Sequence, residues 1–182
     1  LNTAYTAEEV RYFVGDSGAR LLICDPGRGD ALRPVAAELG ARLVTLAADG
    51  SGELSNLAKS KPTHFSPVER KSNDLAALLY TSGTTGRSKG AMLSHQNLLS
   101  NAQVLAAAWR FTASDVLLHA LPVFHTHGLF VATNIALLTG GAMIFLPKFD
   151  TDAVISALPH ATAMMGVPTF YTRLLDDPRF TR

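Results

Sequence analysis

Residues 75–90 read LAALLYTSGTTGRSKG. The first six residues are apolar or aromatic, and such a run predicts a buried strand. The next ten combine hydroxyl side chains with glycines and a single lysine, Lys89. Glycines let backbone N–H groups approach an anion closely, hydroxyls add hydrogen-bond donors, and a lysine adds a positive charge. The stretch therefore predicts a strand followed by a loop that can hold a polyphosphate.

Two common phosphate-binding motifs do not match this loop. A Walker A loop needs Gly-Lys-Ser/Thr, whereas Lys89 stands between Ser88 and Gly90. The loop does not contain the dinucleotide-binding motif Gly-x-Gly-x-x-Gly either. Composition alone also suits an ordinary surface loop, because small polar residues cluster in many turns.

Strand and helix patterns alternate on both sides of this stretch. Thr6 and Glu9 form a capping box at the start of one helix, and Val10, Phe13 and Val14 give it an apolar stripe. Further helices are expected at about 31–39, 53–59, 95–109, 128–138, 150–158 and 168–175, and further strands at 21–24, 43–46, 116–121, 142–146 and 161–165. This order predicts an α/β fold with a mostly parallel sheet flanked by helices.

Composition excludes several classes of protein. Of the 182 residues 47% are hydrophobic, which is enough to build a core and rules out a disordered chain. A net charge of +1 lacks the excess of positive charge that is typical of proteins that bind nucleic acid. The only cysteine, Cys24, cannot form an internal disulfide, which excludes a disulfide-stapled secreted fold and favours the cytoplasm or an organelle matrix.

One long uncharged segment, residues 116–147, has the length of a membrane span. Proline, histidines and the sequence Thr139-Gly140-Gly141 interrupt it, so we expect two buried strands around a buried helix and no membrane span.

The order of residues in the loop is similar to the signature of a known protein family. Residues 81–90 resemble the phosphate-binding signature of the AMP-forming acyl-CoA synthetase, luciferase and adenylation-domain superfamily, Ser/Thr-Ser-Gly-Ser/Thr-Thr-Gly-x-Pro-Lys-Gly. They depart from it at Ser88, where the family has a proline that would restrict φ. Residues 121–128 (LPVFHTHG) and 166–171 (GVPTFY) resemble two later family segments. Within the superfamily, residues 144–150 and 165–173 look most like malonyl-CoA synthetases.

The resemblance implies a place in a larger fold. It makes residues 1–182 a piece of the large N-terminal domain, with a partial α/β lobe and connection in 1–73 and the phosphate-loop and acyl-pocket lobe in 74–182. The family's later motifs for magnesium and ribose are not in the sequence, nor is the C-terminal domain. We therefore expect a longer parent protein, and little or no activity from these residues alone.

The resemblance also implies an activity and its partners. These are a small-molecule carboxylate, most like malonate or methylmalonate, together with ATP, Mg²⁺ and coenzyme A. The family's phosphate contacts fall on Thr81, Ser82, Gly83, Thr84, Thr85, Gly86 and Lys89, with Thr85 near Mg²⁺. The family's acid pocket corresponds to His125 and His127. Malonate has a second carboxylate, and burying it without a partner would be costly. Arg173 is our candidate for the cation that binds it.

Other readings stay open. The parent could act on another carboxylate, such as a fatty or aromatic acid, or it could bind nucleotide without catalysis. Arg173 could be an ordinary solvent-exposed helix arginine. His119, His125 and His127 are close enough in sequence to suggest a metal, but no cysteine or carboxylate stands near them to complete a zinc site.

Overall fold

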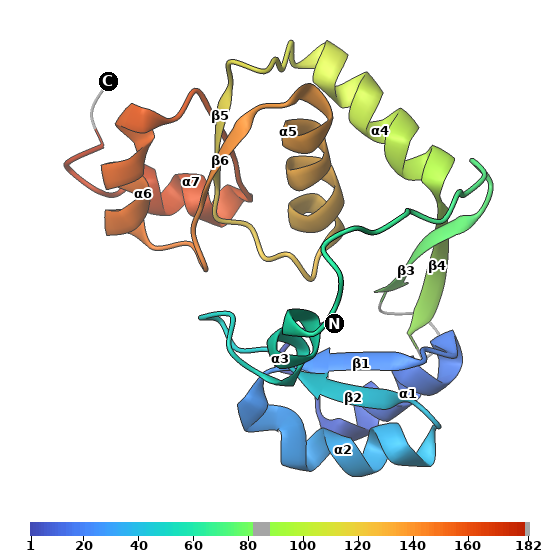
Figure 1. Cartoon of the computed structure of the whole chain (residues 1–182). Helices are drawn as coiled ribbons and strands as arrows, with labels where there is room; N and C mark the ends of the chain where they lie inside the picture. Colours follow the sequence, from blue (N-terminus) through green and yellow to red (C-terminus); the bar gives the residue numbers. More distant parts are fainter. Residues whose placement is uncertain (82–87, 181–182) are drawn as a thin grey trace. The chain divides into compact units, whose positions relative to one another are not determined.

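The computed structural model describes residues 1–81 and 88–180, which form two compact units of α/β structure (Figure 1). The first unit comprises residues 1–70, 80–81 and 88–91, and the second comprises 71–79 and 92–180. Both units contain parallel strands flanked by helices, so the predicted fold class is confirmed.

The first unit is built on two parallel strands. Strand β1 (Leu21–Cys24) pairs with β2 (Arg42–Thr45), Leu21 lying beside Arg42 and Cys24 beside Thr45. The other elements of this unit are α1 (Ala7–Ser17), η1 (Pro26–Arg28), α2 (Gly29–Glu38) and α3 (Glu53–Lys59). Helices α1 and α2 pack on one face of the sheet, and the core between them consists of Val10, Val14, Leu32, Ala36 and Leu43.

Helix α1 has well-defined ends. The Thr6 side chain accepts from the Glu9 backbone N–H while the Glu9 carboxylate accepts from the Thr6 N–H, as the capping box predicted. At the other end Gly18 adopts a left-handed conformation with φ of 61°, which glycine adopts without steric cost. The helix is therefore fixed in length and position by local interactions.

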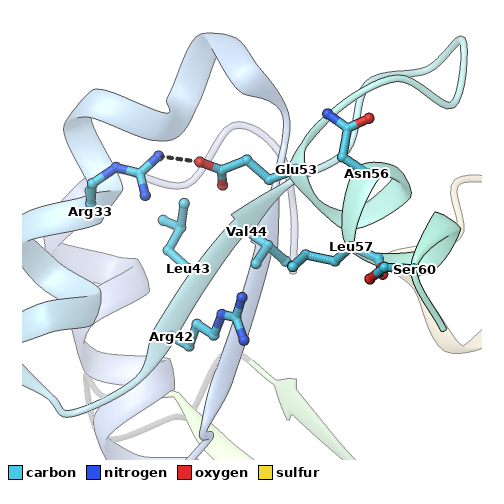
Figure 2. A pocket seen from close by; sticks show the side chains of 8 residues that line it. All are labelled: Arg33, Arg42, Leu43, Val44, Glu53, Asn56, Leu57 and Ser60. Atoms are coloured by element: carbon cyan, nitrogen blue, oxygen red, sulfur yellow. Dashed lines mark hydrogen bonds and ion pairs between the residues drawn. The ribbon is translucent and has the colours of Figure 1, made fainter.

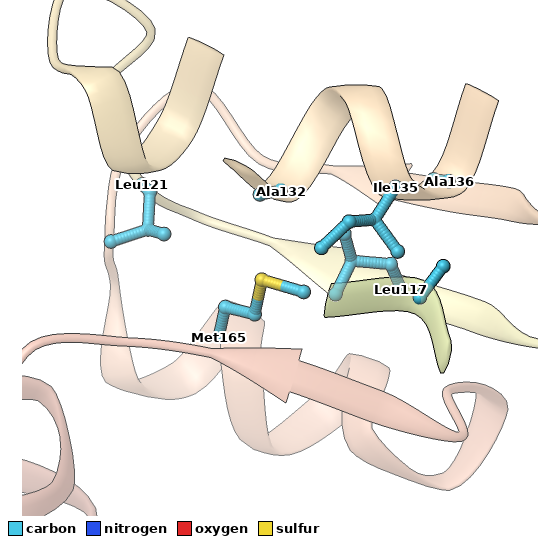
Figure 3. Packing of buried hydrophobic residues seen from close by; sticks show 7 residues of the cluster. Leu117, Leu121, Ala132, Ile135, Ala136 and Met165 are labelled. Atoms are coloured by element: carbon cyan, nitrogen blue, oxygen red, sulfur yellow. The ribbon is translucent and has the colours of Figure 1, made fainter. Parts of the chain in front are cut away.

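The second unit holds a three-stranded parallel sheet in the order β6-β5-β7. Its strands are β5 (Val116–His119), β6 (Ala142–Phe145) and β7 (Ala163–Met165), and its helical elements are α4 (His95–Ala108), η2 (His127–Ala132), α5 (Thr133–Thr139), α6 (Thr151–Ala157), η3 (Leu158–His160) and α7 (Pro168–Leu175). Leu117 and Met165 meet Ala132, Ile135 and Ala136 on one face (Figure 3). On the other face Leu118 meets Val154 of α6 and Leu174 of α7.

Strands β3 (Leu75–Thr81) and β4 (Lys89–Ser94) form a separate two-stranded sheet. Hydrogen bonds from the N–H groups of His95 and Gln96 to the carbonyls of Asp74 and Ser72 continue their association beyond the strands. The sequence predicted β3 but not β4, whose first two residues, Lys89 and Gly90, were expected to belong to the loop.

One more local expectation needs correction. The expected helix at 128–138 begins as a π-helix, η2, and only continues as the α-helix α5. The uncharged segment 116–147 forms β5, η2, α5 and β6, as expected. Among the helices of residues 1–81 and 88–180, none is both long enough and apolar enough to cross a bilayer.

Candidate functional site

The two described ends of the predicted phosphate loop lie on neighbouring strands. Thr81 is the last residue of β3 and Lys89 is the first residue of β4, and both are exposed. The predicted contacts Ser82, Gly83, Thr84, Thr85 and Gly86 lie outside the described residues. Within the described residues the Lys89 ammonium has no hydrogen-bond or ion-pair partner, so its positive charge is available to an anion.

Helix α1 contacts the chain at both of these ends. The Tyr12 hydroxyl donates a hydrogen bond of 2.7 Å to the backbone carbonyl of Ser88, directly before Lys89. The Tyr80 hydroxyl, directly before Thr81, donates a hydrogen bond of 2.6 Å to the Asp16 carboxylate. Sequence reasoning missed both contacts. The available signal was the spacing of Tyr12 and Asp16, which puts them on one face of the helix.

An aromatic cluster surrounds these hydrogen bonds. The Phe13 ring is 4% exposed and lies 4.6 Å from the Tyr80 ring, 5.4 Å from Tyr12 and 4.9 Å from Tyr5, measured between centroids. Burial raises the pKa of Tyr80 to about 12, and the hydrogen bond to Asp16 and the charge of its carboxylate act in the same direction. Tyr80 is therefore held neutral, as a hydrogen-bond donor.

The predicted acid-pocket residues belong to segments that follow the strands of the second unit. The strands β5, β6 and β7 are parallel, and their last residues, His119, Phe145 and Met165, lie side by side. His125 and His127 come after β5, and Arg173 comes after β7. Ligands of open parallel sheets bind beyond the carboxyl ends of the strands, so this edge is the expected place for a small molecule.

The three residues have different surroundings. His125 is exposed, and its ring lies 4.7 Å from that of Phe124. His127 is half-buried and begins η2. Arg173 is exposed in the last turn of α7, with its guanidinium carbon 6.0 Å from the centroid of the Phe149 ring. No contact among the described residues joins Arg173 directly to either histidine.

His119 is a buried histidine at the same edge. It is 1% exposed, and its Nε2 lies 2.9 Å from the carbonyl oxygen of Gly128 in η2. A carbonyl can only accept, so Nε2 carries a hydrogen. Nδ1 has no partner within the described part of the chain. The Thr133 hydroxyl donates to the same Gly128 carbonyl over 2.9 Å, so this contact holds η2 against β5.

The metal alternative finds no support in the described ranges. In residues 1–81 and 88–180 no three His, Cys, Asp or Glu side chains are grouped so that they could hold a metal ion. His119 is engaged with a backbone carbonyl, which leaves its Nε2 unable to act as a metal ligand.

A cleft of about 530 Å³ lies in the first unit, along the outer edge of β2 (Figure 2). It is lined by Arg33, Arg42, Leu43, Val44, Glu53, Asn56, Leu57 and Ser60. The Arg33 guanidinium and the Glu53 carboxylate form an ion pair of 3.2 Å across it. Glu53 also accepts from the backbone N–H of Thr45, so the pair fixes α3 to β2. The cleft contains no predicted site residue.

Comparison with known proteins extends over the whole chain. A family model described as AMP-binding enzyme matches residues 1–182. The mitochondrial malonate–CoA ligase of Mus musculus is 37% identical over 183 residues, covering 96% of this chain and 30% of its own length. The malonate–CoA ligase of Arabidopsis thaliana is 31% identical, with coverages of 96% and 31%.

A solved structure gives a closer match. The crystal structure of ATP-bound MatB from Rhodopseudomonas palustris is 55% identical and superimposes with a TM-score of 0.95, covering 100% of this chain and 36% of that one. The chain thus spans about a third of the length of the proteins that it matches.

Proposed function

Because the chain belongs to the AMP-binding enzyme family, we propose that the protein carrying it is an ATP-dependent, AMP-forming ligase that joins malonate or methylmalonate to coenzyme A. The observation that carries this proposal is the loop between β3 and β4, whose described ends are an exposed threonine and an exposed lysine. The 55% identity to the ATP-bound MatB structure supports ATP as the nucleotide substrate. The similarity to malonate–CoA ligases supports malonate as the acid substrate.

The proposed first step joins the acid to AMP. A carboxylate oxygen of the acid attacks the α-phosphorus of ATP, a new C(O)–O–P bond forms, and pyrophosphate leaves with the electrons of the broken P–O bond. The attack brings two anions together, so positive charge and N–H donors are needed on the leaving phosphates. Backbone and hydroxyl groups of residues 81–86 and the Lys89 ammonium would supply them.

The Mg²⁺ ion would be bound mainly by the nucleotide. Magnesium keeps several waters and binds through phosphates with one or two protein oxygens. Thr85 is our candidate for a protein oxygen, and the described residues offer no cluster of three ligating side chains that would make a separate metal site. A single hydroxyl ligand from the protein would suit an Mg²⁺ ion that is bound mainly through phosphates. When bound, the ion would neutralise charge on the β- and γ-phosphates.

The second step transfers the acyl group to sulfur. The thiol of coenzyme A loses its proton, and its sulfur attacks the acyl carbon of the adenylate. A C–S bond forms, the acyl C–O bond breaks, and AMP leaves with the electrons of that bond. Neither step needs a covalent nucleophile from the protein.

The acid would be bound beyond the carboxyl ends of β5 and β7, by His125, His127 and Arg173. Malonate keeps a second carboxylate that must be paired with a cation or several donors. Arg173 has no acidic partner within the described residues, and its guanidinium lies over the Phe149 ring. A cation held in this way keeps its N–H donors available for a carboxylate. We place the reaction in the cytoplasm or an organelle matrix, consistent with the free Cys24.

The proposal is tested on the full-length protein. Pyrophosphate release should require both ATP and malonate, and thioester formation should require coenzyme A as well. Lys89→Ala should lower kcat/KM for ATP by about 10- to 100-fold, because a charged hydrogen bond contributes about 1.5–3 kcal/mol. Lys59→Ala, which removes an exposed lysine from α3, is the matched control. ATP binding without any pyrophosphate release would instead support a non-catalytic nucleotide-binding protein.

A second variant tests the acid. Arg173→Ala should raise KM for malonate by about 10- to 100-fold, because it removes a hydrogen bond to a charged group. KM for ATP should change less than about twofold. The activity with a short monocarboxylate, which has no second carboxylate, should not fall in this variant. Turnover of a fatty or aromatic acid by the wild-type protein, with none of malonate, would show that the acid is assigned wrongly.

A further inference from the structure

We propose that helix α1 positions both ends of the phosphate loop through Tyr12 and Asp16, which act as positioning residues for ATP binding. This inference rests on the proposed function, since it assumes that residues 81–89 hold the phosphates. It adds two residues far from the loop in sequence, and it assigns them an effect on the nucleotide that differs from their effect on folding.

Each hydrogen bond acts directly next to a proposed phosphate contact. Asp16 holds Tyr80, the residue before Thr81, and Tyr12 holds the carbonyl of Ser88, the residue before Lys89. Tyr12 and Asp16 are four residues apart, so they lie one turn from each other on the same face of α1. A single helix face therefore sets the separation between the residue that enters the loop and the residue that leaves it.

The helix is suited to act as a fixed support. Its start is fixed by the capping box of Thr6 and Glu9, and its end by Gly18. Phe13, on the turn between Tyr12 and Asp16, is buried against the rings of both Tyr12 and Tyr80. Tyrosine rings packed in this way have little rotamer freedom left, so their hydroxyls are directed at fixed points.

The contact at Ser88 has a specific consequence. The family pattern has a proline here, whose ring restricts φ, and serine imposes no such restriction. The hydrogen bond from Tyr12 fixes the carbonyl of this residue instead. The ordering of the loop ends is then achieved before ATP binds, which lowers the entropy that nucleotide binding must overcome.

Three tyrosines of the same aromatic cluster provide a matched experiment in the full-length protein. Tyr12→Phe and Tyr80→Phe each delete one hydroxyl that holds a loop end. Tyr5→Phe deletes a hydroxyl that makes no hydrogen bond within the described residues, while its ring lies 4.9 Å from Phe13. The readouts are KM for ATP, kcat, KM for malonate, the dissociation constant of ATP without acid, and the melting temperature.

We expect Tyr12→Phe and Tyr80→Phe each to weaken ATP binding by about 3- to 10-fold, the effect of losing one neutral hydrogen bond. The double variant should be weaker than either single one, KM for malonate should change less than about twofold, and Tyr5→Phe should bind ATP like the wild type. If all three variants bind ATP alike, or if they lower the melting temperature without changing KM for ATP, the positioning role is wrong.

Hydrogen exchange separates this inference from the proposed function. Peptides that cover residues 80–91 should exchange faster in Tyr12→Phe than in Tyr5→Phe, with no nucleotide present. If the wild-type protein fails to bind ATP, the proposed function fails, but this exchange comparison still decides whether α1 holds the loop ends. Equal exchange in the two variants would overturn the inference even if ATP binds.

Discussion

Strands β1 and β5 differ in how completely helices cover their two faces. In β5, Leu117 and Leu118 point to opposite faces, and both are 0% exposed because α4 and α5 cover one face and α6 and α7 the other. In β1, Leu22 faces α1 and α2, whereas Leu21 and Ile23 on the other face are 48% and 46% exposed. Strand β1 is thus covered on one face only, whereas β5 is covered on both faces.

This difference shows that an apolar strand does not determine its own burial. Residues 21–24 and 116–119 are both short apolar runs, a pattern typical of strands buried on two faces. Both were predicted as strands, and both form strands. Only the packing of helices on the second face distinguishes them. Equivalent substitutions in β1 and β5 should therefore have different costs.

The largest effect is expected where the sheet is covered on both faces. Leu118→Ala should lower the free energy of unfolding by about 3 kcal/mol or more, because it leaves a cavity beside Val154 and Leu174. Leu21→Ala, the same change on an exposed face, should cost less than about 1 kcal/mol, since less apolar area is removed from contact. Urea unfolding of both variants measures the difference, and equal costs would contradict it.

A second contrast uses one glycine from each unit. A Cβ at Gly128 would lie 2.4 Å from the carbonyl oxygen of Pro122, so Gly128→Ala must displace backbone and should cost about 2–3 kcal/mol. A Cβ at Gly15 would lie 3.6 Å from the Leu39 side chain, an ordinary contact. Gly15→Ala should therefore stabilise α1 by about 0.5–1 kcal/mol. Melting temperatures that move in the same direction for both variants would refute this contrast.

Elements with strong local signals could be predicted from the sequence. The capping box located the start of α1, and the helices α3 and α7 formed at the expected residues. These signals lie within a few residues of the structure that they specify. In the candidate site, local signals predicted a strand that ends within one residue of Thr81 and a helix that carries Arg173.

The remaining features depend on residues far apart in the chain. Strand β4 begins in a polar, glycine-containing stretch, and its pairing with β3 is not encoded in any apolar alternation. The π-helix η2 has the composition of an α-helix, and its register is held by His119 from β5. The anchors Tyr12 and Asp16 contact residues 76 and 64 positions away. Sequence periodicity carries no information about such contacts.

Within the first unit, Tyr80 is held to α1 by the hydrogen bond that its hydroxyl donates to the Asp16 carboxylate. The pKa of Tyr80 is about 12 in the folded chain, above the ordinary value of 10. The stabilisation from its neutral hydroxyl is therefore fully present below pH 10 and is lost as the pH rises through 12. Alkaline unfolding followed by circular dichroism should show stability falling in this window. Tyr80→Phe should flatten the fall, and an unchanged slope would contradict the assignment.

The smallest effect is expected on the open face of β1. Ile23→Thr keeps a β-branched side chain that suits a strand, and it removes apolar surface that is already 46% exposed. The substitution should change the free energy of unfolding of the 182-residue chain by less than about 1 kcal/mol. It should also reduce self-association, because exposed apolar surface promotes the association of protein chains. Leu22→Thr, one residue away on the face that meets α1 and α2, should cost clearly more. If the two substitutions cost the same, the two faces of β1 are not covered differently.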